Sequence, residues 1–387
     1  MSYVKLGADK IWFGSKALDA LAGLASKRVF IVECGEINLQ FGFRKIVTDI
    51  LERNGCQWEV FAEVEPEPCF DTIEKGAAAI SRFSPDWIVG FGGGSAMDAA
   101  KAMWVFYEND VCSYKELCEI GGIRHMGEKA KLMCIPTSSG TGSEVTKAAI
   151  IKDSRTHHKY PIVDLQARLI PSVAVLYPAF TVSMPPTITA ACGMDVVTHA
   201  VESFVSKSAN NFSDVMAEGA FRLAVENISR ACEHGDDLNA REAMLEASCM
   251  AGSAFTNSGL GISHAVAHAI GGYTGLPHGL INAVILPEVI IFNAKDNSTA
   301  KKYRKLARDI GTDDLAAFIR MLNARIGIPS SLNEVMNGKE WTTKEWDDMV
   351  QAALDDVNLR NNPREADAEQ MSELITRMYV GEEKWEK

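Results

Sequence analysis

The hydrophobic pattern of this chain changes part-way along, and that change constrains the fold more than any other feature. Before about residue 184, short strand-like runs alternate with longer helical patterns. The strand candidates are Val29–Val32, Gln57–Ala62, Asp86–Phe91 and Lys131–Ile135, and helices are expected over 38–53, 71–83 (with Asp71 as N-cap) and 96–107. This alternation indicates a parallel sheet with helices on both faces.

Beyond Met184-Pro185-Pro186 the strand pattern stops. Ala-, Met- and Leu-rich stretches with helical periodicity take over, and helices are expected over 188–206, 214–233, 239–257, 264–271, 280–293, 299–310, 313–326, 343–357 and 366–379. A chain of 387 residues is long enough for two cores. We therefore predict two domains, an α/β domain over 1–184 and an all-helical domain over 185–387.

The acidic composition limits the partners of the chain. Its formal net charge is -12, so its surface repels phosphate backbones and we expect no nucleic-acid partner. No apolar run reaches the roughly 18 residues that a membrane span needs, so no membrane partner is expected either. The nine cysteines are scattered and form no CxxC pair, which is typical of reduced thiols in the cytoplasm. The apolar helical half is compatible with a homo-oligomer.

A glycine-rich turn follows one of the strand candidates. The apolar run that begins at Trp87 ends in Gly92-Gly93-Gly94-Ser95, and a helical pattern begins directly afterwards. Glycines let a backbone approach a ligand closely, and the first N–H groups of a helix attract a phosphate. The turn lacks GxGxxG spacing, so by itself it is also consistent with an ordinary strand-to-helix connection.

A second polar loop strengthens the case for a nucleotide. Residues 135–144 read IPTSSGTGSE, which places hydroxyl groups and glycines directly after a strand candidate. Loops at the carboxyl ends of parallel strands line the ligand crevice of such sheets. The loop is no P-loop, because it lacks the Gly-Lys-Ser/Thr ending. The two loops together therefore favour a nucleotide site of another kind.

Four histidines and one aspartate of the helical half form a possible metal site. Asp195 and His199 are four residues apart, as are His264 and His268, and His278 follows. Residues at this spacing share one face of a helix. A lone histidine on an apolar helix is more often a packed core residue. One carboxylate with two or three imidazoles, however, is a good donor set for a divalent metal. The other histidines, in polar segments, are expected at the surface: His125, His157, His158 and His234.

Four segments together resemble the iron-containing (group III) alcohol dehydrogenase family, which shares its fold with dehydroquinate synthase and glycerol dehydrogenase. They read GGGSAMDAAK at 92–101, PTSSGTGSEVT at 136–146, GMDVVTHAVESFVS at 193–206, and GISHAVAHAIGG with LPHG within 261–279. The resemblance covers about residues 5–380. It implies a dinucleotide-binding α/β domain over 1–184 and a metal-binding, catalytic helical domain over 185–387, with the active site in the cleft between them.

The resemblance also implies roles for single residues. The metal ligands would be Asp195, His199, His264 and His278, with iron(II) as the family's metal and zinc also suited to them. His268 would be an additional histidine of the cleft and not a ligand. The cofactor, NAD or NADP, would be held by Gly93, Gly94, Ser95, Asp98, Thr137, Ser138 and Thr141, with Lys159 near the nicotinamide ribose. Apart from the resemblance, Phe255, Met126 and the segment 361–364 are candidates for the substrate pocket.

The choice between NAD and NADP depends on a position just after the first strand candidate. Many NAD-preferring members of the family carry an acidic residue there, which binds the adenosine ribose and repels a 2′-phosphate. In this chain the position falls on Cys34 or Gly35, with Glu33 and Glu36 on either side. Loss of the carboxylate would admit NADP, whereas either glutamate could replace it and keep NAD, so both cofactors remain open.

The resemblance and the residues lead to one predicted reaction, hydride transfer between NAD(P)(H) and a small primary alcohol or aldehyde. The metal would polarise the alcohol oxygen, and His268 would relay the proton or be a merely polar residue of the cleft. A dehydroquinate-synthase-like lyase would need several cations near the histidines. Residues 193–279 hold four Lys or Arg, none of them inside the histidine motifs: Lys207, Arg222, Arg230 and Arg241. A protein that only binds metal or nucleotide is disfavoured, because the ligand set looks complete.

Overall fold

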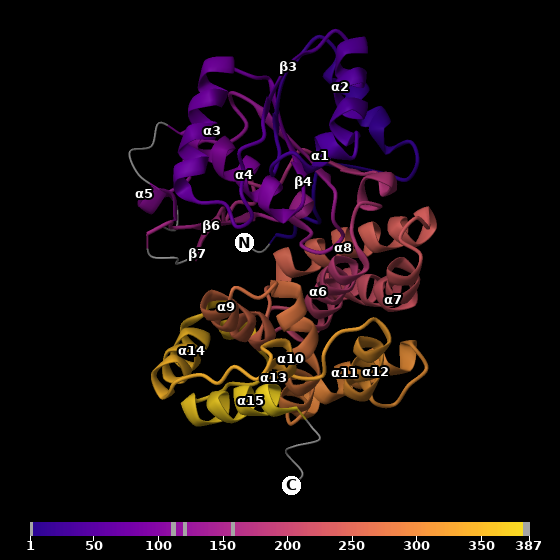
Figure 1. Cartoon of the computed structure of the whole chain (residues 1–387), viewed down its shortest axis with the longest axis vertical. Coiled ribbons are helices and arrows are strands. Elements are labelled where there is room, and N and C mark those ends of the chain that lie inside the picture. The colour runs from indigo at the N-terminus through magenta and orange to yellow at the C-terminus, as the bar shows by residue number, and fades with distance from the viewer. Residues whose placement is uncertain (1–2, 110–113, 119–121, 156–158, 382–387) are drawn as a thin grey trace. The chain divides into compact units, whose positions relative to one another are not determined.

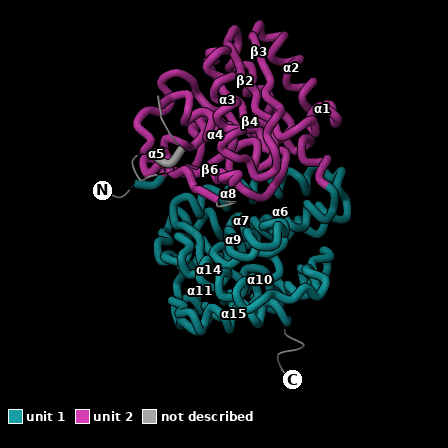
Figure 2. Tube along the Cα trace, turned by 60° about the vertical axis from the view of Figure 1, so that its left-hand side comes forward, with its two compact units in different colours: residues 1–4, 185–387 teal, residues 5–184 magenta. Residues whose placement is uncertain are grey.

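The computed structural model describes residues 3–109, 114–118, 122–155 and 159–381 (Figure 1). The chain forms two compact units, one of residues 5–184 and the other of residues 185–387 together with the first four residues (Figure 2). It passes from the first to the second between Met184 and Pro185, where the strand pattern of the sequence stops.

The unit of residues 5–184 is built on a six-stranded sheet in which all neighbouring strands run parallel. In the order of the sheet the strands are β1 (Lys10–Phe13), β8 (Val173–Leu176), β5 (Lys131–Pro136), β4 (Trp87–Gly92), β2 (Arg28–Val32) and β3 (Gln57–Phe61). A separate antiparallel hairpin is made of β6 (Ala148–Lys152) and β7 (Lys159–Val163). The predicted α/β class and the four predicted strands are confirmed.

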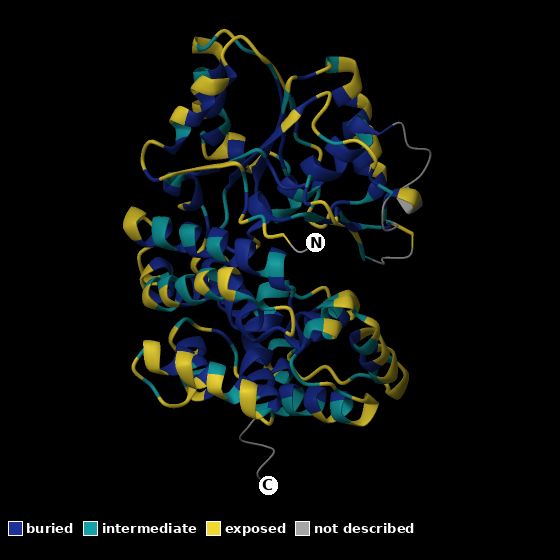
Figure 3. Cartoon of the chain, turned by 180° about the vertical axis from the view of Figure 1, so that it is seen from behind, coloured by how far each residue is buried: buried dark blue, intermediate teal, exposed yellow. Residues whose placement is uncertain are grey.

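Helical segments cover both faces of this sheet. They are α1 (Ile37–Gln40), α2 (Phe43–Arg53), α3 (Phe70–Phe83), α4 (Gly94–Glu108) and α5 (Tyr114–Cys118), with 3-10 turns η1 (Ala17–Leu24), η2 (Ser143–Val145) and η3 (Pro178–Thr181). Along β2, Val29 and Ile31 pack with η1 and α2, whereas Phe30 and Val32 pack with α3 and α4. Both faces of the strand are therefore buried (Figure 3), which explains its unbroken apolar sequence.

Two details of the predicted helices are wrong. The single helix over 38–53 is two helices, because Gly42 adopts a left-handed conformation with φ of 74° between them. Asp71 is not an N-cap: the cap of α3 is Cys69, whose backbone N–H donates to the Glu65 carboxylate at 2.8 Å. Asp71 lies in the first turn and accepts a hydrogen bond from Ser154 at 2.8 Å.

The order of strands places the two polar loops at the centre of the sheet. From β2 the chain moves outward to β3, then returns to the other side of β2 and adds β4, β5 and β8 in turn. The direction of winding therefore reverses between β2 and β4. In open parallel sheets, the crevice at the carboxyl ends of the strands next to such a reversal is the usual ligand position.

The unit that begins at Pro185 is helical throughout its described residues. Its helices are α6 (Pro186–Val205), α7 (Asn211–Glu233), α8 (Leu238–Ser258), α9 (Ile262–Thr274), α10 (His278–Asn293), α11 (Asn297–Asp309), α12 (Leu315–Arg325), α13 (Leu332–Val335), α14 (Thr343–Asp355) and α15 (Ala368–Val380), with the 3-10 turn η4 (Val357–Asn361). The nine predicted helices are confirmed, and the four-residue α13 is new. Helix α6 packs against α7, α8 and α10, so both its polar and apolar side chains are enclosed.

No helix of the described residues is long and apolar enough to cross a bilayer. This agrees with the absence of a long apolar run in the sequence.

Candidate functional site

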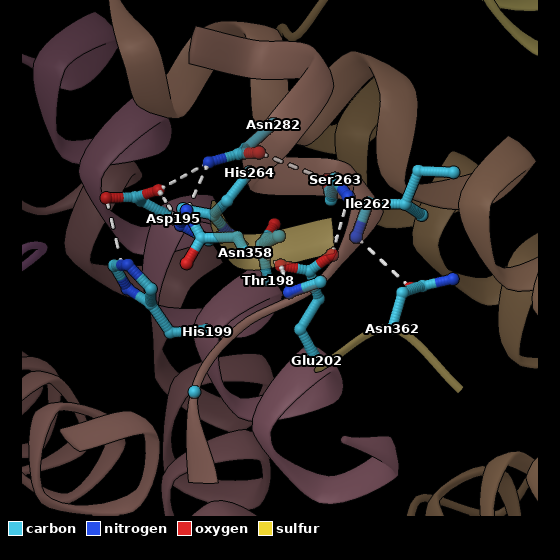
Figure 4. A network of polar contacts seen from close by, with 12 residues as sticks. Asp195, Thr198, His199, Glu202, Ile262, Ser263, His264, Asn282, Asn358 and Asn362 are labelled. Atoms are coloured by element: carbon cyan, nitrogen blue, oxygen red, sulfur yellow. Dashed lines mark hydrogen bonds and ion pairs between the residues drawn. The ribbon is translucent and has the colours of Figure 1, made fainter. Parts of the chain in front are cut away.

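Three helices bring the four expected metal ligands together. Asp195 and His199 are one turn apart on α6, His264 comes from the first turn of α9, and His278 begins α10. The Asp195 carboxylate lies 3.9 Å from His199 Nδ1, 3.9 Å from His264 Nε2 and 3.8 Å from His278 Nε2. Donor atoms of Asp195, His199 and His264 all lie within 4.8 Å of one another (Figure 4).

The chemistry of this cluster fits a divalent cation. Asp195, His199 and His264 are each at most 5% exposed, and His199 Nδ1 is buried without a hydrogen-bond partner among the described residues. A buried polar atom without a partner is costly, and a cation bound among these donors would satisfy it. One carboxylate and three imidazoles suit iron(II) or zinc.

The protonation of the cluster also favours metal binding. Burial raises the pKa of Asp195, but the neighbouring histidines and the amide of Asn282 outweigh it and hold that pKa below its usual value. Burial keeps the pKa values of His264 and His278 well below the usual range. An ionised carboxylate and neutral imidazoles are the forms that bind metals.

Glu202 fixes the orientation of one of the imidazoles. Its buried carboxylate lies 2.6 Å from His264 Nδ1 and accepts backbone hydrogen bonds from Gly261 at 3.1 Å and Ser263 at 2.6 Å. Burial raises the pKa of Glu202 to about 7, opposed by these backbone hydrogen bonds. This contact favours the tautomer in which Nδ1 donates its proton to Glu202. That tautomer leaves a lone pair on Nε2, which lies 3.9 Å from Asp195 and can bind a metal there.

Asn282 faces the same cluster from α10. Its amide nitrogen donates to Asp195 Oδ1 at 2.9 Å and lies 3.1 Å from His278 Nε2 and 3.4 Å from His264 Nε2. The sequence analysis missed both Asn282 and Glu202. Helical spacing was the available signal, since Glu202 follows His199 by three residues and Asn282 follows His278 by four.

His268 lies beside the cluster with a partner of its own. Its ring is stacked on that of His278 with 5.1 Å between centroids, and its Nδ1 is 2.8 Å from Asp356 Oδ2. The side chain is 34% exposed, far more than His264. Its second nitrogen, Nε2, is therefore the atom that remains for exchange of a proton. Asp356 was also missed by the sequence analysis.

The candidates for the substrate pocket differ in their surroundings. Met126 packs against a hydrophobic core of the unit of residues 5–184. Phe255 stacks on His199 with 4.5 Å between ring centroids, so it borders the cluster. In the segment 361–364, Asn362 accepts a hydrogen bond from Ile262 N at 3.1 Å and so supports the start of α9. The Arg364 guanidinium lies over the ring of Phe292, 3.9 Å from its centroid.

In the other unit, the glycine-rich turn and the hydroxyl-rich loop lie against each other. Thr137 N donates to Gly92 O at 2.9 Å, next to the start of α4. A Cβ added to Gly93 would lie 3.3 Å from Ser138 Oγ, and one added to Gly94 would lie 2.8 Å from Thr141 Cγ2. The structure thus groups Gly93, Gly94, Thr137, Ser138 and Thr141 at the carboxyl ends of β4 and β5. There the absence of glycine side chains lets the second loop pack against the start of α4.

Asp98 supports this pair of loops from within. Its carboxylate accepts hydrogen bonds from Ser143 Oγ at 2.6 Å and from Ile150 N at 3.0 Å. The buried ammonium of Lys101 donates nearby to Thr146 and to the carbonyl of Ala148, at 2.8–2.9 Å. The structure therefore shows Asp98 holding the second loop, and direct contact with a cofactor stays a prediction.

Glu67 contacts both Lys159 and Ser95. Lys159 begins β7 and pairs with the carboxylate of Glu67, whose backbone N–H donates to Ser95 Oγ at 3.3 Å. The lysine expected at the nicotinamide ribose is therefore connected to the glycine-rich turn through the ion pair and the hydrogen bond of Glu67.

The end of β2 clarifies which carboxylate is available to a ribose. Glu33 is fully buried and lies 2.7 Å from the Arg44 guanidinium. Glu36 also pairs with Arg44, at 3.1 Å, but its side chain is 54% exposed. Cys34 is half-buried. Of the two glutamates, Glu36 is the one in contact with solvent.

Family models match both units of the chain. "Iron-containing alcohol dehydrogenase" matches residues 8–178, and "Fe-containing alcohol dehydrogenase family, C-terminal" matches residues 189–379. The chain belongs to the iron-containing alcohol dehydrogenase family. The predicted family, its fold and the reaction class, a nicotinamide- and metal-dependent alcohol dehydrogenase, are thereby confirmed.

Individual members of the family are similar over almost their whole length. An NADPH-dependent butanol dehydrogenase of Clostridium saccharobutylicum is 35% identical over 382 residues, 96% of this chain and 97% of that protein. The 1-propanol dehydrogenase PduQ of Citrobacter freundii is 38% identical over 377 residues, 95% and 97% of the two chains. The iron-containing alcohol dehydrogenase of Thermococcus thioreducens has 31% identity and a TM-score of 0.90, covering 98% of this chain and 100% of that one.

The other four histidines were predicted to lie at the surface. His125 and His234 are exposed, as predicted for the surface. His157 and His158 lie outside the described residues.

Proposed function

We propose that this iron-family dehydrogenase interconverts small primary alcohols and aldehydes. In this proposal the unit of residues 185–387 holds the metal through Asp195, His199, His264 and His278. The unit of residues 5–184 holds NAD or NADP through its two loops and Lys159. When bound, the cation supplies Lewis acidity toward the alcohol oxygen, and the nicotinamide supplies the hydride acceptor.

One observation supports the metal assignment most strongly. A buried carboxylate is surrounded at 3.8–3.9 Å by ring nitrogens of three histidines, and one of these nitrogens has no hydrogen-bond partner among the described residues. Packing alone does not explain such an arrangement, because buried polar atoms are normally satisfied. Iron(II) is the metal of the proposal, and zinc is the alternative that the ligands also allow.

The chain's own residues account for orientation and proton movement. Glu202 and Asn282 hold two ligands in place by hydrogen bonds to His264 and Asp195. His268 is proposed to accept the alcohol proton at Nε2 and pass it to solvent, because Asp356 occupies its Nδ1 and the ring is partly exposed.

The Lys and Arg side chains within residues 193–279 favour a weakly charged substrate, since Arg222 is exposed and the other three have partners elsewhere. Arg241 is buried and donates to Thr189 Oγ1 at 2.9 Å, and Arg230 pairs with Asp237. Lys207 lies 3.5 Å from Glu365. A lyase that binds a phosphate and a carboxylate needs cations directed at its substrate, and these three side chains have other partners.

The cofactor proposal covers both dinucleotides, with Glu36 as the residue that biases the choice. Glu33 is unsuited to a ribose hydroxyl because Arg44 holds it in a buried pair. An exposed carboxylate near a ribose disfavours a 2′-phosphate through like-charge repulsion. Glu36 is therefore proposed to favour NAD without excluding NADP.

We further propose a cytoplasmic homo-oligomer without nucleic-acid or membrane partners. None of the eight described cysteines forms a disulfide, as in a reducing compartment. Strand β1 is an edge of the sheet, and its residues Ile11, Trp12 and Phe13 are 38%, 39% and 62% exposed. An apolar edge strand is a template for pairing, here with a second copy. A Trp12→Lys variant that remains oligomeric by light scattering would contradict this contact.

Turnover experiments test the proposed reaction. The ferrous-loaded protein is expected to reduce short aldehydes anaerobically with NADH or NADPH, to lose turnover on chelation and to regain it when metal is returned. Protein that holds metal and dinucleotide yet turns over no aldehyde would contradict the proposal.

A further inference from the structure

Two lysines face each other across the β6–β7 hairpin. Lys152 on β6 is in register with Lys159 on β7, and their side chains are 29% and 31% exposed. Like charges directly opposite each other on an antiparallel pair are destabilising, so this pair needs a counter-charge. Lys159 is the lysine proposed to lie near the cofactor, whereas Lys152 has no role in the site described above.

Glu67, in the loop between β3 and α3, supplies the counter-charge. Its carboxylate pairs with Lys159, and its Oε2 lies 3.5 Å from Lys152 Nζ. Burial raises the pKa of Glu67, but the two lysines outweigh burial and hold that pKa below its usual value. The loop is fastened along β6, where Lys152 N donates to Pro68 O at 2.9 Å. The three charged groups therefore form one cluster with a net charge of about +1.

The backbone of Glu67 is strained. Its φ is 57°, a left-handed conformation that is unfavourable for a residue with a side chain. It stands between Pro66 and Pro68, and its N–H donates to Ser95 Oγ in the glycine-rich turn. Strain of this kind persists where the surroundings impose it and is concentrated at functional sites. Here it places one carboxylate between the lysine pair and the loop proposed to hold the dinucleotide.

We propose that Lys152 and Lys159 form a subsite for a phosphate group of the nicotinamide dinucleotide, with Glu67 as an internal counter-ion that the phosphate partly replaces. This inference rests on the proposed function. An arriving phosphate is attracted by two ammonium groups and repelled by one carboxylate. Lys152 thus strengthens cofactor binding, and Glu67 weakens it. When no phosphate is bound, Glu67 offsets the repulsion between the two lysines of the hairpin.

The opposite effects of Lys152 and Glu67 are tested by measuring the Kd of the full chain for NADH and NADPH through nicotinamide fluorescence. For half-exposed charges we expect Lys152→Met to raise Kd about two- to fivefold and Glu67→Gln to lower it about two- to fivefold. The double variant has the net charge of the wild type, so its Kd is expected near the wild-type value. All differences should shrink at high ionic strength, where such charges are screened.

The chain offers a matched control pair on α2. Lys45 and Asp49 form an exposed ion pair at 2.8 Å, on the sheet face opposite α3 and α4. Lys45→Met and Asp49→Asn change the same charges without touching the hairpin and should leave Kd unchanged. Glu67→Asn guards against loop distortion, because Asn tolerates positive φ and is also uncharged. It is expected to lower Kd as Glu67→Gln does.

The possible results separate the inference from the proposed function. If the wild type binds dinucleotide and the Glu67 variants bind it equally or more weakly, the counter-ion role is wrong. A wild type that binds neither NADH nor NADPH contradicts the proposed function itself. Effects of equal size on NADH and NADPH support the subsite and assign it to the pyrophosphate that both cofactors share. Effects on NADPH alone would place the lysines at the 2′-phosphate, away from the nicotinamide ribose, and would contradict the inference.

Discussion

Glu202→Gln is the substitution that most directly tests how the metal ligands are held in place. The carboxylate faces three donors: Oε2 accepts from Gly261 N and His264 Nδ1, and Oε1 accepts from Ser263 N. Glutamine replaces one acceptor oxygen by an NH2 group. In one orientation that NH2 faces Ser263 N–H, and an unpaired buried donor costs about 1–3 kcal/mol.

In the other orientation the NH2 group faces His264 Nδ1. That nitrogen must then become an acceptor, so the proton moves to Nε2, the atom that faces Asp195. Loss of such an orienting partner lowers metal affinity by about 10- to 100-fold, or about 1.4–2.7 kcal/mol. We therefore expect Glu202→Gln to weaken binding of zinc(II), a redox-inert probe, by this factor in a competition assay with a fluorescent chelator.

A matched variant separates loss of metal binding from loss of stability. Glu108 is also a buried carboxylate that accepts backbone hydrogen bonds, from residues 128, 129 and 130 at 2.9–3.0 Å. Its side-chain partner is the indole N–H of Trp104, at 3.2 Å, and not an imidazole. Glu108→Gln should lower the Tm of the metal-free protein and leave its zinc affinity unchanged. If Glu202→Gln lowers Tm to a similar extent but keeps wild-type zinc affinity, Glu202 merely caps α9 and the argument fails.

Three further substitutions test other parts of the structure. A Cβ on Gly279 would lie 2.3 Å from Ala191 O, so Gly279→Ala should push α10 away from α6, lower Tm and weaken zinc binding at least tenfold; unchanged affinity would contradict this. Burial raises the pKa of Glu144 from 4.5 to about 7, so the stability contributed by its protonated form is present below pH 4.5 and lost as pH rises through 7. The Tm of Glu144→Gln relative to wild type should therefore rise by roughly 2–8 °C between pH 5 and pH 8, and a constant difference would exclude the effect. Glu36→Gln should raise kcat/KM for NADPH relative to NADH about two- to fivefold, and an unchanged ratio would remove Glu36 from cofactor choice.

The sequence was sufficient where a side chain's role follows from spacing along one element. Asp195 and His199 share a face of α6, so their proximity follows from helical geometry. The glycine-rich turn was recognisable for a similar reason, because it joins a buried strand to a helix. The convergence of α9 and α10 on α6 depends on tertiary packing. The residue types suggested a shared metal site, and the family resemblance supplied the set of four ligands.

The failures have local physical causes. The break at Gly42 was missed because a single glycine inside a helical pattern is often tolerated, and only its left-handed φ reveals the interruption. The wrong cap at Asp71 arose because the capping carboxylate, Glu65, precedes the helix by several residues and acts on Cys69. In both places, the deciding information is a backbone angle or a contact, neither of which a residue pattern contains.

The residues that the sequence analysis missed share one property. Glu202 and Asn282 act on ligands of the cluster, and Asp356 acts on the neighbouring His268, each by a hydrogen bond of 2.6–2.9 Å. An acid or amide on a helix has no chemical signature of its own, so its purpose becomes visible only when its partner is known. The ligands decide whether a metal can bind, whereas these partners fix which nitrogen carries a proton and where each lone pair points. Relatives with the same four ligands but different residues at the positions of Glu202 and Asn282 should therefore differ in metal affinity more than in fold.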